Sequence, residues 1–486
     1  MLAYDPKVIC LFLCIMVICM MVNKVIVCPI CGKRTFLRIQ DGGYLNEYPI
    51  RVNCYNCHTL LKGVYIMDTR SPYRGLFMIN ADVEECDMDS ETLTCRNADY
   101  VAEVSGELPC DFVKEYDGGL PESPFMRSTN CLDSAENHIR RLTYFTKNIE
   151  EWKKKKSTAF QLLDDGRIEY IATALNNKIG EYSYECDHYL KSLHCLQEVV
   201  LEETKDIFLN PDQDEYVRKI ICKMSQVDDE MLHQFVELLG GVHGLILSYK
   251  KCVNVFSEFM GIYANLLPAE TYMNFKTKEG ANGCIATCSF VDLKSFYQDA
   301  YEALLSLMYI PVCLDNIVIR GNFQVFDSTY EDILCPKNKN RDLEWYKKLD
   351  NGKRYNKLNY EECYQRLIDF PAKRFLRNGI GHNNINYDGI TQIITAYDLK
   401  DPNRIKYKDS LMNMAIDCIG LAKSAVVFSE MILFMLRHEL KAEGIHSIMH
   451  PRFYKGVKLN DNCPCGSGIK YKKCCMNDVE MVLRSL

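Results

Sequence analysis

The spacing at which hydrophobic and polar residues alternate changes along the chain. Residues 24–67 carry short apolar runs divided by turn signals, which predict β-strands. From about residue 129 onward, apolar residues recur at three-and-four spacing, which is typical of amphipathic helices. No fixed-period repeat accompanies this spacing, so it predicts a helical array over 129–276 and not a solenoid.

A break rich in Gly and Asn at 277–284 precedes a second helical region, 285–445. Inside it, "NIVIRGNFQVFD" (316–327) has some strand character. The alternation around Asp388 and Gly389 predicts a hairpin of the primed-turn type. Charges recur six or seven residues apart in the apolar run 411–442 and gather on one stripe. This stripe favours a buried core helix or a dimer helix over a bilayer span.

The N-terminal segment and the acidic stretch need separate interpretation. Residues 8–22 are uncharged and apolar, but shorter than the about 20 residues that span a bilayer. Residues 1–23 therefore fit an over-extended start, a membrane anchor or a cleaved signal peptide. Residues 71–128 contain the acidic run 82–122, which has thirteen Asp or Glu against two basic residues, and predict a connector.

Length and composition narrow the class of protein. At 486 residues the chain exceeds one hydrophobic core and predicts several domains. A net charge of −7 confines any RNA or DNA contact to a local patch. The 25 cysteines are odd in number and largely scattered, which predicts reduced thiols in the cytoplasm. His233 and His243 lack a carboxylate arrangement for a metal and are interpreted as ordinary histidines. No Walker loop or nucleophile elbow supports a nucleotide hydrolase or serine esterase.

Two CxxC pairs near the N-terminus point to a metal site. They are Cys28 and Cys31 in "CPIC" and Cys54 and Cys57 in "CYNC", with 22 residues between the pairs. Each pair can place two thiolates on one cation, and the intervening strands would bring the pairs together tetrahedrally. This pattern resembles a zinc ribbon over 24–70. Four thiolates close the coordination sphere, so the expected Zn²⁺ is structural; a redox CxxC is the alternative.

A second cysteine cluster lies in "DNCPCGSGIKYKKCC" near the C-terminus. Its cysteines, spaced CxC and then CC around Gly-Ser-Gly and Lys-Tyr-Lys, resemble the SEC-C motif, a small zinc module at the C-terminus of the Sec translocase motor. The resemblance covers 458–480 and implies a second structural Zn²⁺, with docking to a protein or nucleic acid partner. The expected ligands are Cys463, Cys465, Cys474 and Cys475.

The stretch "RFLRNGIGHNN" holds the candidate chemistry. RNA can be cleaved without a metal when the 2′-hydroxyl attacks the neighbouring phosphorus, with a histidine relaying protons and a guanidinium holding the phosphate. Arg377 and His382 supply these groups, but five helical residues rotate them about 140° apart. We therefore expect Gly379 and Gly381 to weaken the helix and let His382 turn toward Arg377.

Arg377, Asn378 and His382 also resemble the motif of the HEPN superfamily, whose ribonucleases carry Arg, four to six residues, and His. The resemblance spans 285–445. It implies that Arg377 binds phosphate, His382 acts as acid or base, Asn378 positions the substrate, and two copies pair as a homodimer. In the alternative interpretation, Arg377 caps a helix C-terminus and His382 holds the following hairpin.

These observations predict a mainly α protein. It has an N-terminal β zinc ribbon, a helical array, a HEPN-like bundle with a small β-hairpin, and a C-terminal zinc knuckle. The predicted function is that of a cytoplasmic zinc-binding protein that cleaves RNA without a catalytic metal, in stress or phage defence. The alternative is a non-catalytic adaptor that binds protein or nucleic acid partners through its zinc modules. A membrane is expected only if residues 8–22 are an anchor.

Overall fold

The chain folds as two compact units, each built from three separate segments. Unit 1 comprises Met1–Lys147, Phe259–Gln298 and Lys373–Ile419, and unit 2 comprises Asn148–Glu258, Asp299–Ala372 and Gly420–Leu486. Within them, the computed structural model describes these residues, apart from short gaps and a few isolated positions: 20–119, 157–183, 191–197, 228–326, 342–350, 373–442 and 454–479. Residues 1–19, which hold most of the apolar N-terminal run, lie outside the described residues.

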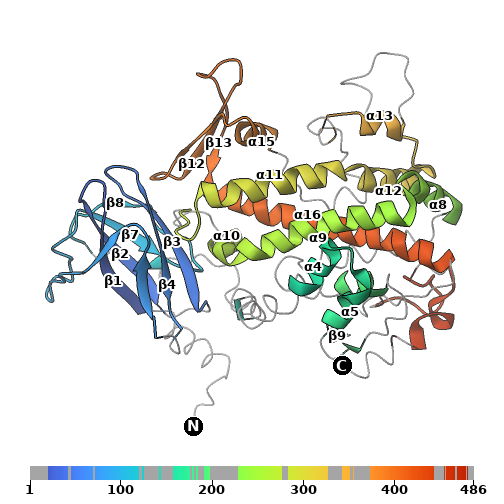
Figure 1. Cartoon of the computed structure of the whole chain (residues 1–486), viewed down its shortest axis with the longest axis horizontal. Helices are drawn as coiled ribbons and strands as arrows, with labels where there is room; N and C mark the ends of the chain where they lie inside the picture. The colour runs from blue at the N-terminus through green and yellow to red at the C-terminus, as the bar shows by residue number, and fades with distance from the viewer. Residues whose placement is uncertain are drawn as a thin grey trace, which may run out of the picture. The chain divides into compact units, whose positions relative to one another are not determined.

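Two sheets form the N-terminal part of unit 1 (Figure 1). The first has the order β6-β1-β2-β7-β8 and pairs antiparallel except between β2 and β7. The second is the antiparallel meander β3-β4-β5. The strands are β1 (Met20–Val27), β2 (Arg34–Asp41), β3 (Glu47–Asn53), β4 (Leu60–Ile66), β5 (Gly75–Met78), β6 (Asp82–Glu85), β7 (Tyr100–Val104) and β8 (Lys114–Glu115).

Burial explains why these segments form sheets. In β3, residues Tyr48, Ile50 and Val52 are buried and alternate with more exposed neighbours, which is the period-two pattern of a strand with one covered face. In contrast, β7 is buried at all five positions. Strands β5 to β8 lie within the acidic stretch that charge predicted to be a connector. These residues form strands in which acidic side chains take part: Glu84 and Glu85 belong to the edge strand β6, and Glu103 lies within β7 and is only 3% exposed.

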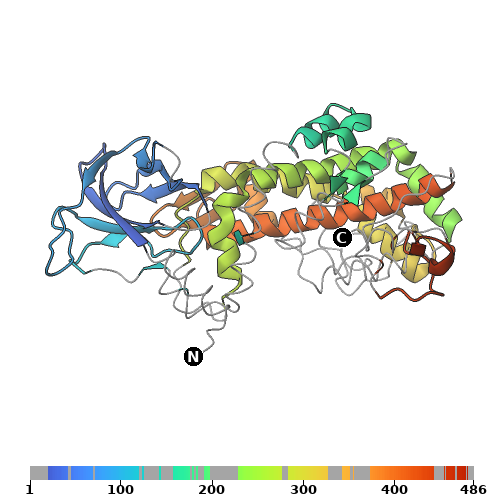
Figure 2. The same cartoon turned by 90° about the horizontal axis from the view of Figure 1, so that it is seen from below.

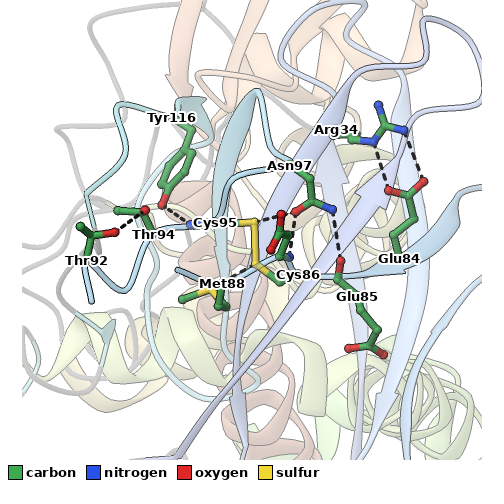
Figure 3. The surroundings of a disulfide bond; sticks show 11 residues. Arg34, Glu84, Glu85, Cys86, Met88, Thr92, Thr94, Cys95, Asn97 and Tyr116 are labelled. Atoms are coloured by element: carbon green, nitrogen blue, oxygen red, sulfur yellow. Dashed lines mark hydrogen bonds and ion pairs between the residues drawn. A yellow bond between two sulfur atoms is a disulfide. The ribbon is translucent and has the colours of Figure 1, made fainter. Parts of the chain in front are cut away.

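A disulfide between Cys86 and Cys95 links the chain after β6 to the segment before β7 (Figure 3). An isolated bridge between Met88 and Cys95 brings the two cysteines together. Cys95 also packs in the core with Phe36 and donates its backbone N–H to Tyr116 Oη at 2.9 Å. The prediction of reduced thiols throughout is therefore wrong for this pair, since a tight turn places side by side two cysteines nine residues apart.

A short helix and a three-stranded sheet follow in unit 1. They are α15 (Arg374–Gly381) and the meander of β11 (Ile385–Asp388), β12 (Ile393–Tyr397) and β13 (Ile405–Ser410). The predicted hairpin is confirmed, but Asp388 pairs with Ile393, so four residues and not a two-residue primed turn connect the strands. Gln392, and not Gly389, adopts the left-handed conformation, with φ of 53°.

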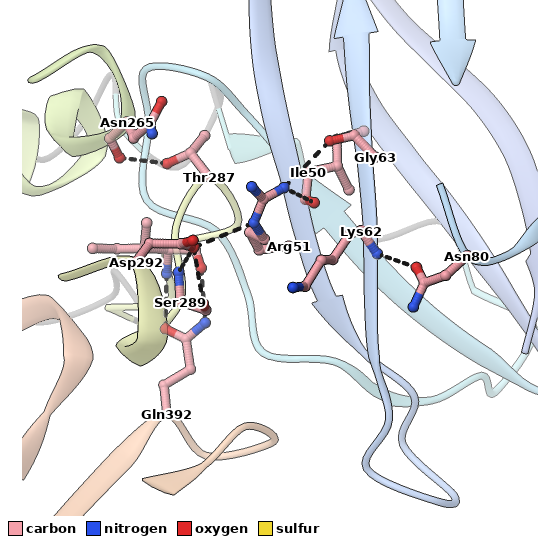
Figure 4. A network of polar contacts seen from close by, with 11 residues as sticks. Ile50, Arg51, Lys62, Gly63, Asn80, Asn265, Thr287, Ser289, Asp292 and Gln392 are labelled. Atoms are coloured by element: carbon pink, nitrogen blue, oxygen red, sulfur yellow. Dashed lines mark hydrogen bonds and ion pairs between the residues drawn. The ribbon is translucent and has the colours of Figure 1, made fainter. Parts of the chain in front are cut away.

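Polar contacts fasten strand β3 to this part of unit 1 (Figure 4). Arg51 donates from Nε to Asp292 Oδ2 at 3.2 Å, and its backbone N–H donates to Ala286 O at 2.8 Å. The Gln392 side chain exchanges two hydrogen bonds with the backbone of Ile285, at 2.9 and 2.7 Å. The first sheets and the hairpin therefore meet the same segment, the chain just before and within α11 (Phe290–Ser306).

Unit 2 is mainly helical where it is described, and it also contains an antiparallel pair of short strands, β9 (Lys178–Ile179) and β10 (Tyr182–Ser183). Residues 316–320, where the sequence indicated strand character, belong to α12, and Asn316 and Ile317 are buried there against apolar neighbours. Figure 1 shows α9 crossing α16 at an angle, and Figure 2, seen from below, shows the two helices one above the other. The remaining helices of four or more residues are α4 (Ser157–Asp164), α5 (Ile171–Ala174), α8 (Asp229–Leu238), α9 (Gly241–Ile262), α10 (Leu267–Met273), α12 (Tyr309–Arg320), α13 (Leu343–Lys347) and α16 (Leu411–Ala442).

Two helical stretches, Phe290–Arg320 and Leu411–Leu440, are long and apolar enough to cross a membrane by length and composition. In the most apolar windows of the two, 67% and 94% of the residues are buried inside the structure. A helix covered by protein on nearly all sides is apolar because it forms the core. The predicted core role of α16 is thereby confirmed, whereas its role as a dimer seam stays a prediction.

Candidate functional site

The first cysteine cluster lies at two turns of the N-terminal sheets. Cys28 Sγ lies 3.5 Å from Cys57 Sγ, and Cys31 Sγ lies 3.6 Å from Cys54 Sγ. All four sulfur atoms lie within 4.8 Å of one another. A tetrahedral zinc site with Zn–S bonds of about 2.3 Å has S···S edges of about 3.8 Å, so the four thiols need only a small adjustment to hold such an ion.

The two turns of this cluster share one backbone conformation. In the first, Cys28 accepts from Gly32 N at 2.9 Å, and in the second, Cys54 accepts from His58 N at 2.8 Å. The residue after each CxxC is left-handed, with φ of 70° at Gly32 and 60° at His58. His58 therefore completes the turn as Gly32 does, and it lies outside the group of four sulfur atoms. His58 is therefore a neighbour of the candidate ligands and not a member of the group.

The second cluster contains Cys463, Cys465, Cys474 and Cys475, whose sulfur atoms also lie within 4.8 Å of one another. Cys465 Sγ lies 3.4 Å from Cys474 Sγ, which lies 3.7 Å from Cys475 Sγ. The backbone of Cys463 donates to Ile469 O at 2.8 Å and closes the turn. Gly468, with φ of 68°, supplies the expected left-handed position. Its expected partner Gly466 lies outside the described residues.

Electrostatics favour a cation in the first cluster. Burial raises the pKa of Cys54 to about 12, whereas the hydrogen bond with the Thr59 hydroxyl lowers the pKa of Cys57 to about 6. Four adjacent thiols cannot all ionise on their own, because each new thiolate repels the last. A divalent cation removes this repulsion and binds all four deprotonated. Each cluster could therefore hold a metal ion, and the four-sulfur donor set suits zinc.

Arg377, Asn378 and His382 lie at the C-terminal end of α15. His382 is the C-cap residue, and Asn383 follows it with φ of 53°. Asn384 N donates to Gly379 O at 2.8 Å and Asn383 N donates to Ile380 O at 3.1 Å. These two bonds and the left-handed Asn383 make a Schellman motif, which ends the helix at a defined residue. The imidazole of His382 is exposed at this end.

The two glycines of the motif do not weaken the helix, which continues through Gly381. A Cβ on Gly379 would lie 2.6 Å from Ala396 Cβ, so glycine is required for α15 to pack on β12. A Cβ on Gly381 would meet nothing closer than Gln298 Nε2 at 3.9 Å. We expected a weakened helix to let His382 turn toward Arg377. The helix is continuous through Gly381, so it offers no such weakening.

Arg377 and Asn378 are in contact. Both are partly buried, and Arg377 Nη1 donates to Asn378 Oδ1 at 3.1 Å. Because its guanidinium is tied to the neighbouring amide, Arg377 is held at the side of α15 and does not cap the helix C-terminus, where the Schellman bonds already satisfy the carbonyls. The structure thus brings Arg377 and Asn378 together and places His382 at the exposed end of the same helix.

A pocket of about 320 Å³ adjoins this helix. It lies between α15, the end of β12 and the start of β13, which Figure 1 shows next to one another. Asn378 therefore contacts Arg377 and also faces the pocket. The residues that give the pocket its chemistry are Phe375, Asn378, Tyr397, Asp398, Lys400 and Lys406.

Unit 2 contains a cluster of ionisable residues that the sequence did not indicate. His233 Nδ1 lies 2.8 Å from one carboxylate oxygen of Glu439, and His438 Nδ1 lies 3.3 Å from the other. His438 Nε2 contacts Asp229 at 2.9 Å. His233 and Glu439 are 206 residues apart, so no local spacing could have paired them.

Comparison with known proteins supports the C-terminal module. The SEC-C motif matches residues 460–477. Protein translocase subunit SecA of Carboxydothermus hydrogenoformans is 29% identical over 151 residues, which cover 27% of this chain and 16% of that protein. The chain thus matches about a sixth of the length of this relative. No solved structure matches the chain. The SEC-C motif binds zinc in general, which agrees with the second cluster.

Proposed function

We propose that the chain is a zinc-stabilised endoribonuclease of the HEPN type that cleaves RNA without a catalytic metal. The proposal rests chiefly on the end of α15. There a fixed helix terminus presents the exposed imidazole of His382 five residues after Arg377, whose guanidinium contacts Asn378. The adjoining pocket adds Lys400 and Lys406, cations suited to a polyanionic substrate.

The proposed reaction is an internal transesterification. The 2′-oxygen of one nucleotide forms a bond to the adjacent phosphorus, and the bond from phosphorus to the 5′-oxygen of the next nucleotide breaks. His382 takes the proton of the 2′-hydroxyl or supplies the proton that the leaving 5′-oxygen needs. Arg377 binds the nonbridging oxygens as charge builds on them. Asn378 orients the guanidinium through the hydrogen bond to Arg377 Nη1.

The two four-cysteine clusters hold the fold and take no part in this reaction. The N-terminal cluster would bind Zn²⁺ through Cys28, Cys31, Cys54 and Cys57, and the C-terminal cluster through Cys463, Cys465, Cys474 and Cys475. A Zn²⁺ bound there would cross-link distant turns of the chain. It would not bind a substrate, because four thiolates leave no open coordination position. The HEPN resemblance adds the proposal that two copies pair, so that two α15 motifs share one RNA.

The test is RNA cleavage by the full chain in EDTA, with zinc content measured alongside. We expect the wild type to leave 2′,3′-cyclic phosphate ends and to spare an oligonucleotide that has 2′-deoxyribose at the scissile position. His382→Ala should lower the rate by about 10²–10⁴-fold, the range for general acid–base catalysis. Its side chain is exposed and Ala fits the C-cap, so folding should be unaffected.

His243→Ala removes an exposed histidine of α9 and serves as the matched control, with wild-type activity expected. Arg377→Lys keeps the charge but loses the bidentate geometry, and its rate should fall without unfolding. An inactive wild type would refute the proposal, as would equal rates for the wild type and His382→Ala.

One observation favours a second role as an adaptor. At the SEC-C module, Lys470, Lys472 and Lys473 are all exposed, next to Ile469, which is 45% exposed. A basic surface with an apolar residue suits an acidic protein partner. In that role Arg377→Lys and His382→Ala would leave partner capture unchanged, whereas Cys465→Ser would abolish it.

A further inference from the structure

The pocket beside α15 has the composition of a nucleotide site. Its lining includes two aromatic residues, Phe375 and Tyr397, and two lysines, Lys400 and Lys406. Phe375 is 39% exposed, so its ring is accessible to a ligand. A volume of about 320 Å³ lies at the lower end of the usual range for small-ligand sites and accommodates one base with its sugar.

Positive charge surrounds the aromatic ring. Arg374 Cζ lies 4.9 Å and Lys406 Nζ lies 5.7 Å from the centre of the Phe375 ring. The single acidic side chain among the pocket-lining residues, Asp398, binds Lys406 at 3.0 Å and accepts from Lys400 N at 2.9 Å. The two positive charges of Lys400 and Lys406 exceed the single negative charge of the Asp398 carboxylate. The pocket therefore favours a ligand that is flat at one end and anionic at the other.

Asn378 connects the pocket with the proposed reaction centre. Its Oδ1 accepts from Arg377, which leaves the Nδ2 amide group able to donate to a ligand in the pocket. A molecule in the pocket thus lies one side chain away from the guanidinium.

We propose that this pocket binds the base of a single-stranded RNA nucleotide adjacent to the phosphate at Arg377. The proposal rests on the proposed ribonuclease function and specifies how its substrate is recognised. The base stacks on Phe375 and accepts a hydrogen bond from Asn378, and Lys400 contacts the backbone. Stacking tolerates every base because each has a π-face, so the pocket sets position along the strand more than sequence.

The experiment measures binding apart from cleavage. The probe is a fluorescent RNA pentanucleotide with 2′-O-methyl groups at every position, which cannot undergo the transesterification, titrated into the full chain and followed by anisotropy. Phe375→Leu keeps an apolar side chain but removes the stacking surface, and we expect at least tenfold weaker binding. Lys400→Ala should weaken binding and reduce its dependence on salt. Lys408→Ala, an exposed lysine of β13 outside the pocket, is the matched control and should bind like the wild type.

The outcomes separate this proposal from the ribonuclease itself. His382→Ala should bind the probe like the wild type while losing cleavage of ordinary RNA. If the wild type cleaves RNA and Phe375→Leu has the same KM and cleavage positions, the pocket proposal is refuted and the nuclease stands. If the wild type binds the probe through Phe375 but never cleaves RNA, the pocket stands and the nuclease is refuted. Absence of probe binding to the wild type also refutes the pocket.

Discussion

Replacement of Arg437 should expose how much unit 2 depends on one buried ion pair. Arg437 Nη2 donates to Glu430 Oε1 at 2.9 Å, and each of the two side chains is only 3% exposed. The second carboxylate oxygen accepts from Gln197 Nε2 at 3.1 Å. Arg437 Nε also lies 3.3 Å from His194 Nδ1. Both charges are thus satisfied inside the core, at positions about two turns apart on the same face of α16.

Arg437→Met keeps an unbranched, flexible side chain, shorter than that of arginine, but leaves the Glu430 carboxylate without its cation. Removing one partner of a buried pair costs about 3–5 kcal/mol, because the remaining charge stays desolvated. In a folding unit of this size, 1 kcal/mol corresponds to about 2–4 °C in Tm, so we expect a fall of roughly 6–20 °C. The double variant Arg437→Met/Glu430→Met removes both charges and should recover most of this loss.

Thermal and urea unfolding, followed by circular dichroism at the same protein concentration, measure both variants. Lys408→Met, which changes an exposed lysine, should shift Tm by no more than about 1–2 °C and controls for the substitution itself. A loss below about 1 kcal/mol for Arg437→Met would contradict a desolvated pair. A double variant as unstable as Arg437→Met would show that packing, and not charge, dominates.

Three further predictions concern metal, pH and backbone. Cys54→Ser should lower zinc from two to one per chain in elemental analysis, and an unchanged content would refute that ligand. Burial alone would lower the pKa of His438, but its two carboxylate partners outweigh burial and raise it. This stabilisation is complete below about pH 6.5 and disappears as pH rises through the folded-state pKa, so unfolding of His438→Asn should lack the wild-type pH dependence across that window. Gly389→Ala would place Cβ 2.2 Å from Asn53 Nδ2 and should cost about 1–3 kcal/mol, whereas Gly381→Ala should cost nothing in the same melts.

The features predicted correctly from the sequence have local signals. Closely spaced cysteines, as CxxC in the first cluster and as CxC and CC in the second, place pairs of sulfur atoms within single turns, so the spacing indicated the first cluster and the resemblance to the SEC-C motif indicated the second. The hairpin after α15 follows from alternation on both sides of Asp388. The core helix α16 follows from a continuous apolar run with one polar stripe. Each signal lies within about thirty residues of sequence, which is the range over which periodicity carries information.

The features that escaped prediction depend on contacts distant in sequence. Charge in residues 82–122 concealed strands, because acidic residues lie within β6 and β8 at the sheet edges and even within β7, which is buried at every position. The left-handed Gln392 was missed because its conformation is held by hydrogen bonds with Ile285, 107 residues away. Glycine at 379 was interpreted as a helix breaker, although it is there because Ala396 approaches it. A glycine in the sequence does not by itself show whether it serves backbone flexibility or the close approach of a neighbouring side chain.

Contacts within unit 1 explain why a metal-free reaction would accompany a four-cysteine cluster. Asn53 immediately precedes Cys54, donates to His58 O at 2.8 Å and packs against Gly389 of the hairpin loop. His58 Nδ1 lies 3.9 Å from Oδ1 of Asp388, the last residue of β11 before that loop. The turn that holds two of the four sulfur atoms is therefore in contact with the sheet on which α15 packs. A metal bound there would fix the support of α15 at a distance from the proposed reaction centre, so zinc would act on that centre through backbone position and not through chemistry.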